Sequence, residues 1–157
     1  MDQALQTSAS LASGTPEWPA EIQAEFATQA FNPRVGTKLL SINERVRVWE
    51  IRLQPGERIG FHRHVLDYFW TAVTPGSALS HQGDGSVVKA TYTAGQTQHY
   101  VFGPGEWKLH DLENVGATEL IFTTVEFLQS ANHPLPLPAD VTHAVAAASP
   151  KPEPATA

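Results

Sequence analysis

Short apolar segments separated by glycine- and proline-containing turns fill most of this chain and restrict its fold more than any other feature. From residue 36 to 130, nine strand-like segments alternate with turn sequences such as PGE, GDG, GPG and NVG. Glycine and proline provide the backbone angles that tight turns require, and a regular succession of short strands builds a sandwich or a closed barrel. The sequence therefore predicts one all-β domain at 36–130.

The chain before the strands has the signals of a short helix. Residues 1–14 are small and polar, which predicts a flexible N-terminus, and 15–35 form a helical lead-in. Thr15 and Pro16 are suited to the first positions of a helix. On a helix near 19–30, one face carries the apolar side chains of Ile22, Phe26 and Ala30.

The chain after the strands changes composition again. Residues 131–143 contain three prolines and predict an extended segment that wraps the barrel or a neighbouring subunit. Residues 144–157 are rich in alanine and proline and lack apolar periodicity, so we expect a disordered tail.

Composition excludes several classes of partner and site. A formal charge of -6 argues against a nucleic-acid partner, and no apolar run approaches the length of a membrane span. The chain has no cysteine, which leaves histidine and carboxylate as possible metal ligands. Its first residues lack the basic start and apolar core of a signal peptide, so we expect a cytoplasmic protein.

Two histidines one residue apart, His62 and His64, mark the stretch best suited to chemistry. Side chains at i and i+2 of a strand point to the same face, so both imidazoles would offer adjacent ligands to one metal ion. The alternative is a pair of surface histidines on an edge strand. A third histidine, His110 in GPGEWKLHDLENVG, favours the metal site.

These two stretches resemble the two motifs of the cupin superfamily. Gly56, the HxH pair at His62 and His64, and Gly76 match the first motif, and His110 with Asn114 matches the end of the second. The sequences of these stretches are similar to those of small single-domain cupins, some of them labelled β-alanine-degradation proteins. The resemblance implies a double-stranded β-helix, or jelly-roll barrel, whose inward side chains fill the lumen or line a small cavity.

The chain departs from the family at the motif glutamate. Counting back from Gly76 places Phe69 at that position, whereas the shorter family spacing would place Tyr68 there. Neither side chain can ligate as a carboxylate does, so the resemblance implies a site of three histidines or a vestigial site. The spacing from Gly95 to His110 is also longer than the family pattern.

If Phe69 faces the interior, strand alternation predicts the direction of the other side chains in this strand. Asp67 would share that face and could orient a ligand or act as a general base, unless it caps its own turn. Thr71 and Val73 would line the cavity. His99 is the best outside candidate for a fourth ligand or proton shuttle. Tyr68 and Trp70 would face outward, where exposed aromatics favour a homodimer.

Other polar residues receive structural interpretations. Arg63, between the two histidines, is expected to form a salt bridge, and Asn114 to shape the turn after the His110 strand. Three histidines are interpreted as surface residues: His81, His133 and His143.

Three neutral imidazoles suit several divalent metals, namely Fe(II), Zn, Mn, Ni and Cu. Three-His iron sites resemble those of thiol and diketone-cleaving dioxygenases within the cupins, so Fe(II) is favoured. Because neutral ligands leave the ion its full charge, we expect a small, anionic, chelating substrate. The sequence thus predicts a mononuclear metal enzyme acting on a small acid or carbonyl compound, with an Fe(II) dioxygenase favoured. A metal-dependent lyase or isomerase, and a non-catalytic small-molecule binder, are the alternatives.

Overall fold

The fold is described from a computed structural model that defines residues 17–148. Helix α1 spans Ala20–Thr28 and helix α2 spans Ala139–Ala148. Nine strands lie between them: β1 Lys38–Ile42, β2 Val46–Leu53, β3 Arg58–His64, β4 Tyr68–Ala72, β5 Gly76–His81, β6 Val87–Tyr92, β7 Thr97–Tyr100, β8 Lys108–Asn114 and β9 Leu120–Phe127.

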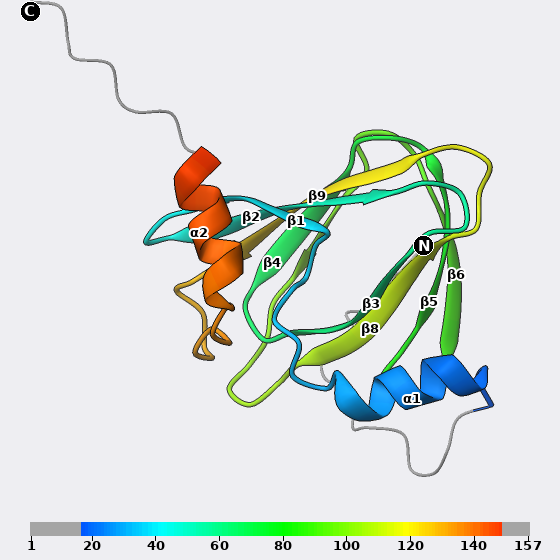
Figure 1. Cartoon of the computed structure of the whole chain (residues 1–157), viewed down its shortest axis with the longest axis horizontal. Coiled ribbons are helices and arrows are strands. Elements are labelled where there is room, and N and C mark those ends of the chain that lie inside the picture. Colours follow the sequence, from blue (N-terminus) through cyan, green and yellow to red (C-terminus); the bar gives the residue numbers. More distant parts are fainter. Residues whose placement is uncertain (1–16, 149–157) are drawn as a thin grey trace, which may run out of the picture.

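The strands form two antiparallel sheets that face each other (Figure 1). One sheet has the order β1-β2-β9-β4-β7 and the other the order β3-β8-β5-β6. Most neighbours in the sheets are distant in sequence, as when β2 pairs with β9 along its whole length from Val46↔Phe127 to Leu53↔Leu120, whereas β1-β2 and β5-β6 are consecutive. The predicted all-β jelly roll with a short N-terminal helix is confirmed.

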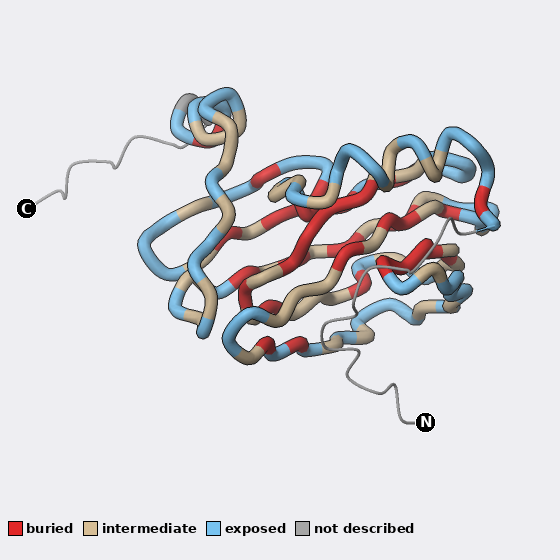
Figure 2. The backbone as a smooth tube through the Cα atoms, turned by 90° about the horizontal axis from the view of Figure 1, so that it is seen from below, coloured by how far each residue is buried: buried red, intermediate tan, exposed pale blue. Residues whose placement is uncertain are grey.

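The core lies between the sheets and follows strand alternation. On β2, Arg47, Trp49, Ile51 and Leu53 are buried, while Val46 and the alternate residues that follow it are more exposed. The buried stretches run through the middle strands and the exposed ones lie at the turns and edges (Figure 2). One end of the interior is a compact apolar cluster formed by Ile51, Leu53, Ile59, Ala72, Ala78, Leu112, Leu120 and Phe122.

Helix α1 covers the outer face of the sheet that contains β3 and β8 (Figure 1). Ile22, Phe26 and Ala30 pack against a cluster that includes Phe61 and Leu109, so the amphipathic face was predicted correctly. The helix begins after Pro19, which makes no side-chain cap. This agrees with the helix predicted near 19–30, whereas Thr15 and Pro16, which were suited to a helix start, lie outside the described part of the chain.

Helix α2 corrects the prediction for the C-terminal region. The sequence indicated an extended segment at 131–143 and a disordered tail at 144–157, but residues 139–148 are helical. Val145 is 7% exposed and packs with Val35, Leu39 and Trp49. Alanine has the highest helix propensity, and tertiary packing of one apolar residue stabilises a helix that composition alone does not reveal. Residues 1–14 and 149–157 lie outside the described part.

No helix within residues 17–148 is long and apolar enough to cross a membrane.

The packing of α2 can be tested at two neighbouring positions. Val145→Asp places a charge in an apolar cluster and should lower the free energy of unfolding by about 2 kcal/mol, or roughly 4–8 °C in melting temperature. Ala144→Asp adds the same side chain at an exposed position of the same helix and should change the melting temperature far less. Equal melting temperatures for the two variants would show that α2 does not pack on the barrel.

Candidate metal centre

A β-bulge in strand β3 sets the direction of the first two histidines. Ile59 pairs with Leu112 on β8 and His62 pairs with His110, so three steps along β3 correspond to two along β8. The extra residue reverses the alternation, because one added residue turns the following side chains to the other face. Ile59, His62 and His64 therefore all face the interior, while Phe61 faces α1.

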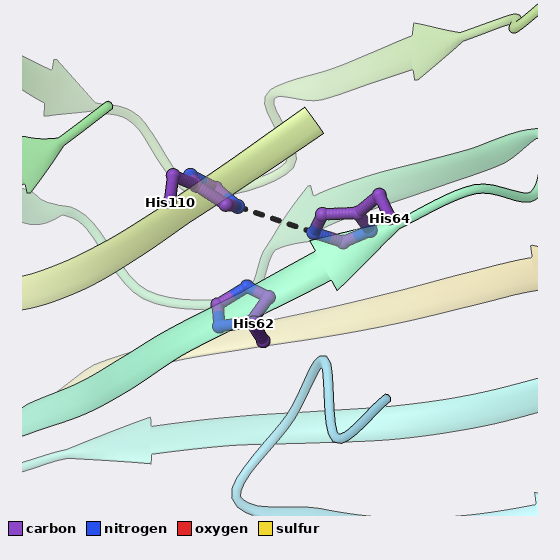
Figure 3. Close-up of side chains that lie close together, drawn as sticks. All are labelled: His62, His64 and His110. Atoms are coloured by element: carbon purple, nitrogen blue, oxygen red, sulfur yellow. Dashed lines mark hydrogen bonds between the residues drawn. The ribbon is translucent and has the colours of Figure 1, made fainter. Parts of the chain in front are cut away.

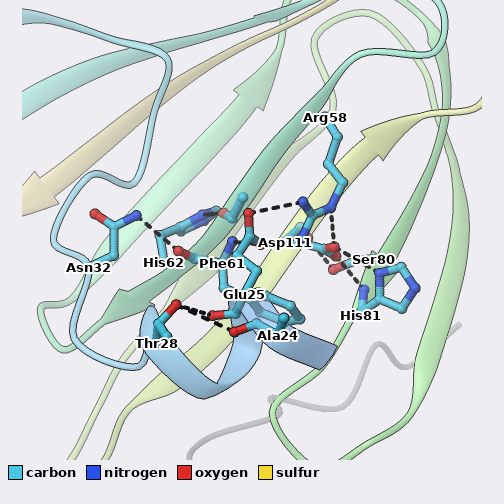
Figure 4. A network of polar contacts seen from close by, with 11 residues as sticks. Ala24, Glu25, Thr28, Asn32, Arg58, Phe61, His62, Ser80, His81 and Asp111 are labelled. Carbon is cyan, nitrogen blue, oxygen red and sulfur yellow. Dashed lines mark hydrogen bonds and ion pairs between the residues drawn. The ribbon is translucent and has the colours of Figure 1, made fainter. Parts of the chain in front are cut away.

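Glu25 on helix α1 holds the bulge from outside the barrel (Figure 4). Its Oε2 accepts a hydrogen bond from the Phe61 backbone N–H at 3.1 Å and pairs with Nη2 of Arg58 at 2.5 Å. A Cβ at Gly60 would lie 2.6 Å from Glu25 Oε1, so a larger residue there would require the carboxylate to shift from this position. Burial would raise the pKa of Glu25, but the hydrogen bonds from Arg58 and Phe61 outweigh it and lower the pKa overall.

The bulge brings His62 and His64 opposite His110 (Figure 3). One ring nitrogen from each of the three lies within 4.8 Å of the other two, and His64 Nε2 is 3.1 Å from His110 Nε2. The ring centroids of His62 and His110 are 4.7 Å apart. The structure thus brings together the three residues that the sequence selected, in an arrangement that one cation can bridge.

Hydrogen bonds to Nδ1 orient two of the rings so that Nε2 carries the lone pair. His62 Nδ1 lies 2.8 Å from the Gly60 carbonyl, which can only accept, so the ring proton is on Nδ1. Ser80 Oγ donates to the Asp111 carbonyl at 2.5 Å and therefore accepts from His110 Nδ1 at 3.3 Å. In both rings the metal-binding lone pair is on Nε2.

Stacking orients the third ring. His64 Nδ1 is buried and has no hydrogen-bond partner among the described residues. The ring instead lies against Tyr68, with centroids 4.0 Å apart and planes at 11°. Tyr68 stacks in turn on Tyr100 at 4.6 Å. An aromatic column therefore occupies the place next to the histidines where the family motif has a carboxylate.

The electrostatics of the site favour neutral imidazoles. Burial lowers the pKa of His62 to about 4 and lowers the pKa values of His64 and His110 well below the usual value. At neutral pH all three rings therefore hold an unshared electron pair for a cation. Three neutral nitrogen donors fit a divalent transition metal and do not fit Mg²⁺ or Ca²⁺, which require oxygen ligands.

The three histidines lie in the wall of an interior cavity of about 370 Å³. This volume is near the lower end of small-ligand sites. Its polar lining comprises the histidines with Ser80, Gln82, Gln98, Lys108 and Thr124, and its larger apolar and aromatic residues are Ile51, Tyr68, Trp70, Tyr92, Tyr100, Leu112 and Phe122. No aspartate or glutamate of residues 17–148 lines it.

Strand β4 has the opposite orientation to the predicted one. Tyr68 and Trp70 line the cavity, whereas Phe69, Thr71 and Val73 do not. Phe69 lies on the outer face beside His99, with ring centroids 5.2 Å apart, so His99 is not a fourth ligand either. The prediction assigned directions by counting back from Gly76. Residues 73–75 are not part of the strand, so the alternation of side chains does not continue through them. Counted from the histidines, the shorter family spacing selects Tyr68, which lines the cavity.

Asp67 is a turn residue outside the cavity, which corrects its predicted catalytic role. It lies between β3 and β4, and its Oδ1 accepts a hydrogen bond from the Phe102 backbone N–H at 3.0 Å. Its own N–H donates to Ser130 Oγ at 2.9 Å. Asp67 therefore joins its own turn to the segments that carry Phe102 and Ser130; it is a turn residue, as in the alternative interpretation, but its carboxylate caps the backbone of Phe102 and not that of its own turn.

Two further residues differ from the sequence interpretation. Arg63 makes no salt bridge within residues 17–148; its guanidinium lies between the rings of Phe31 and Trp107, at 4.2 and 4.1 Å. His81 is buried, with Nδ1 2.8 Å from Asp111 Oδ2, and is not a surface residue.

Other structural interpretations agree with the structure. Asn114 shapes the turn after β8, since its Oδ1 accepts from Gly116 N–H at 2.9 Å and its Nδ2 donates to the Leu53 carbonyl. His133 and His143 are exposed.

Sequence reasoning missed Lys108, Ser80 and Gln82 in the cavity wall. Lys108 and His110 are at i and i+2 on one strand, so alternation alone could have placed the lysine beside the ligands. Ser80 and Gln82 carried no comparable signal, because their approach to His110 depends on the pairing of β5 with β8.

Comparisons with known proteins agree with this architecture. A crystal structure of a cupin domain from Bordetella pertussis Tohama I is 32% identical, with a TM-score of 0.50, and the alignment covers 57% of this chain and 88% of that one. The chain belongs to the cupin superfamily. A second structure, an uncharacterised conserved protein with a double-stranded β-helix domain from Klebsiella pneumoniae, is 27% identical over 60% of this chain and 76% of that one, with a TM-score of 0.47. No family model and no curated protein matches the sequence.

The ligand set can be tested by metal analysis. His62→Ala, His64→Ala and His110→Ala should each remove most of the transition metal bound per chain, because each deletes one of three donors. His99→Ala and His133→Ala change exposed histidines and should retain it. Elemental analysis of untagged protein measures this, and full occupancy in the His110→Ala variant would contradict the ligand set.

The orientation of β4 can be tested with a pair of glutamate variants. Tyr68→Glu puts a hard anionic oxygen next to His64 and should raise Mn(II) affinity roughly tenfold or more. Without metal the same buried, unpaired carboxylate should lower the melting temperature. Phe69→Glu on the outer face should change neither property much. Titration calorimetry with Mn(II) and thermal melts with and without Mn(II) measure these effects. Changes in affinity and melting temperature found only in Phe69→Glu would contradict the observed orientation of β4.

Proposed function

We propose that this cupin is a mononuclear metal-dependent enzyme acting on a small organic acid, with an Fe(II) dioxygenase favoured. The observation that carries the proposal is the set of three neutral imidazoles, two buried and one partly buried, on a cavity wall that has no carboxylate among the described residues. Iron bound by His62, His64 and His110 would supply O2 activation and leave coordination positions open to substrate. Because the donors are neutral, the ion would keep its full charge, which favours an anionic substrate.

The surrounding residues have defined tasks in such a reaction. The aromatic column of Tyr68 and Tyr100 keeps the His64 ring in place and would exclude water from that side of a metal held by the histidines. Burial keeps Tyr68 protonated, because its pKa lies well above the usual value, so its hydroxyl can donate a hydrogen bond but does not ligate as an anion. Gln82 Nε2 donates to Ser80 Oγ at 2.8 Å and thereby supports the contact to His110.

A metal-dependent lyase or isomerase is the second candidate, because the same cavity could hold a metal acting as a Lewis acid. A non-catalytic binder is the third, since function is determined by the site and not by the fold. The homodimer also stays a prediction, but Tyr68 and Trp70 give it no support because both face the cavity.

Oxygen consumption separates these candidates. Protein reconstituted anaerobically with Fe(II) should consume O2 together with at least one compound of a panel of small carboxylic and keto acids. The His62→Ala variant provides the matched background. Loss of a panel compound without O2 uptake in the Zn or Mn form would favour the lyase or isomerase. Saturable binding without turnover in any metal form would favour the binder.

A further inference from the structure

Lys108 is a partly buried cation in the cavity wall that forms no salt bridge within residues 17–148, although Asp84 acts on its charge from a longer distance. Its side chain lines the cavity, and burial lowers its pKa to about 8. Its Nζ lies 4.8 Å from the centroid of the Tyr100 ring, but no carboxylate of residues 17–148 is within salt-bridge distance. A buried charge is normally paired, because leaving it unpaired is costly. The charge of Lys108 is therefore available to an anionic group inside the cavity.

The alternation of β8 places this cation at one end of a cavity wall whose other end is apolar. Lys108, His110 and Leu112 follow one another at i, i+2 and i+4 on the inward face. A strand rises about 3.3 Å per residue, so the lysine and the leucine lie about 7 Å to either side of the histidine. His64 is the direct cross-strand partner of Lys108. Beyond His110 the walls become apolar at Leu112, Phe122 and Ile51.

We propose that Lys108 anchors the carboxylate of a monocarboxylic ligand whose apolar body occupies the Leu112 end of the cavity. The atoms next to the carboxylate then face the three histidines in between. This assignment rests on the proposed function only in taking the cavity as the substrate site. It adds a specificity-determining residue and a direction of binding, and it selects a carboxylate attached to an apolar or aromatic group.

Benzoate and its neutral isostere benzamide test the anchor directly. Binding of each is measured by titration calorimetry on the full chain after chelator treatment, and again after loading with Zn(II). In the metal-free protein the wild type should bind benzoate about tenfold or more tightly than benzamide, because the lysine is then the cavity's only fixed charge among the described residues. Equal affinities for the two compounds would overturn the proposal without any variant.

Variants locate the effect. Lys108→Met keeps the length of the side chain and removes its charge, so the preference for benzoate should disappear while benzamide binds as before. Lys108→Arg should retain most of the preference. Lys89→Met, an exposed lysine on β6, is the matched control and should behave as wild type. A Lys108→Met protein that keeps both its fold and its preference for benzoate would overturn the assignment.

Elemental analysis of the same samples separates this inference from the proposed function. If the wild type binds no metal but the Lys108→Met variant loses the preference for benzoate, the proposed function is contradicted and the role of Lys108 as anchor is supported. If metal binding depends on the histidines but the preference for benzoate does not depend on Lys108, the anchor is contradicted and the metal site of the proposed function is supported.

Discussion

The interior of this protein depends on one extra residue in β3. The bulge between Ile59 and His62 lets a single strand supply an apolar side chain to the core, two imidazoles to the cavity and Phe61 to the helix outside. A regular strand would send His62 and Ile59 to opposite faces. The free N–H of the bulge is satisfied by Glu25, so helix α1 is part of the site although it contacts only the outer face. This carboxylate acts as an anion, and because its pKa is lowered its contribution is lost as the pH falls through that value.

Much of the fold could be read from the sequence because its signals are local. Turn residues and alternating apolar positions mark all nine strands, and the apolar positions of α1 repeat with helical period. The grouping of His62 and His64 follows from strand alternation, and His110 followed from the resemblance to a known family. The helix α2 was missed because its stability comes from contacts of Val145 with residues about a hundred positions earlier.

The errors at the site have a common physical origin. Strand alternation is reliable only where the strand is continuous, and both the 73–75 segment and the loop before β4 interrupt it. An error of one position moved Tyr68 and Trp70 outward and Phe69 inward, and with them the roles of Asp67 and His99. His81 looked exposed beside a GDG turn, but it forms a buried pair with Asp111 on a strand that is adjacent only in space.

The pairing of β3 with β8 has a consequence for how the barrel holds together. His64 and His110 are 46 residues apart in sequence and meet only when these two strands align. An ion held by both would act as a cross-link, and it would bind the native state and not the unfolded chain. Closing a loop of this length is among the slower and entropically costlier events in folding. Metal supply would therefore govern how often this sheet opens, and a chain without metal would be the more readily degraded one.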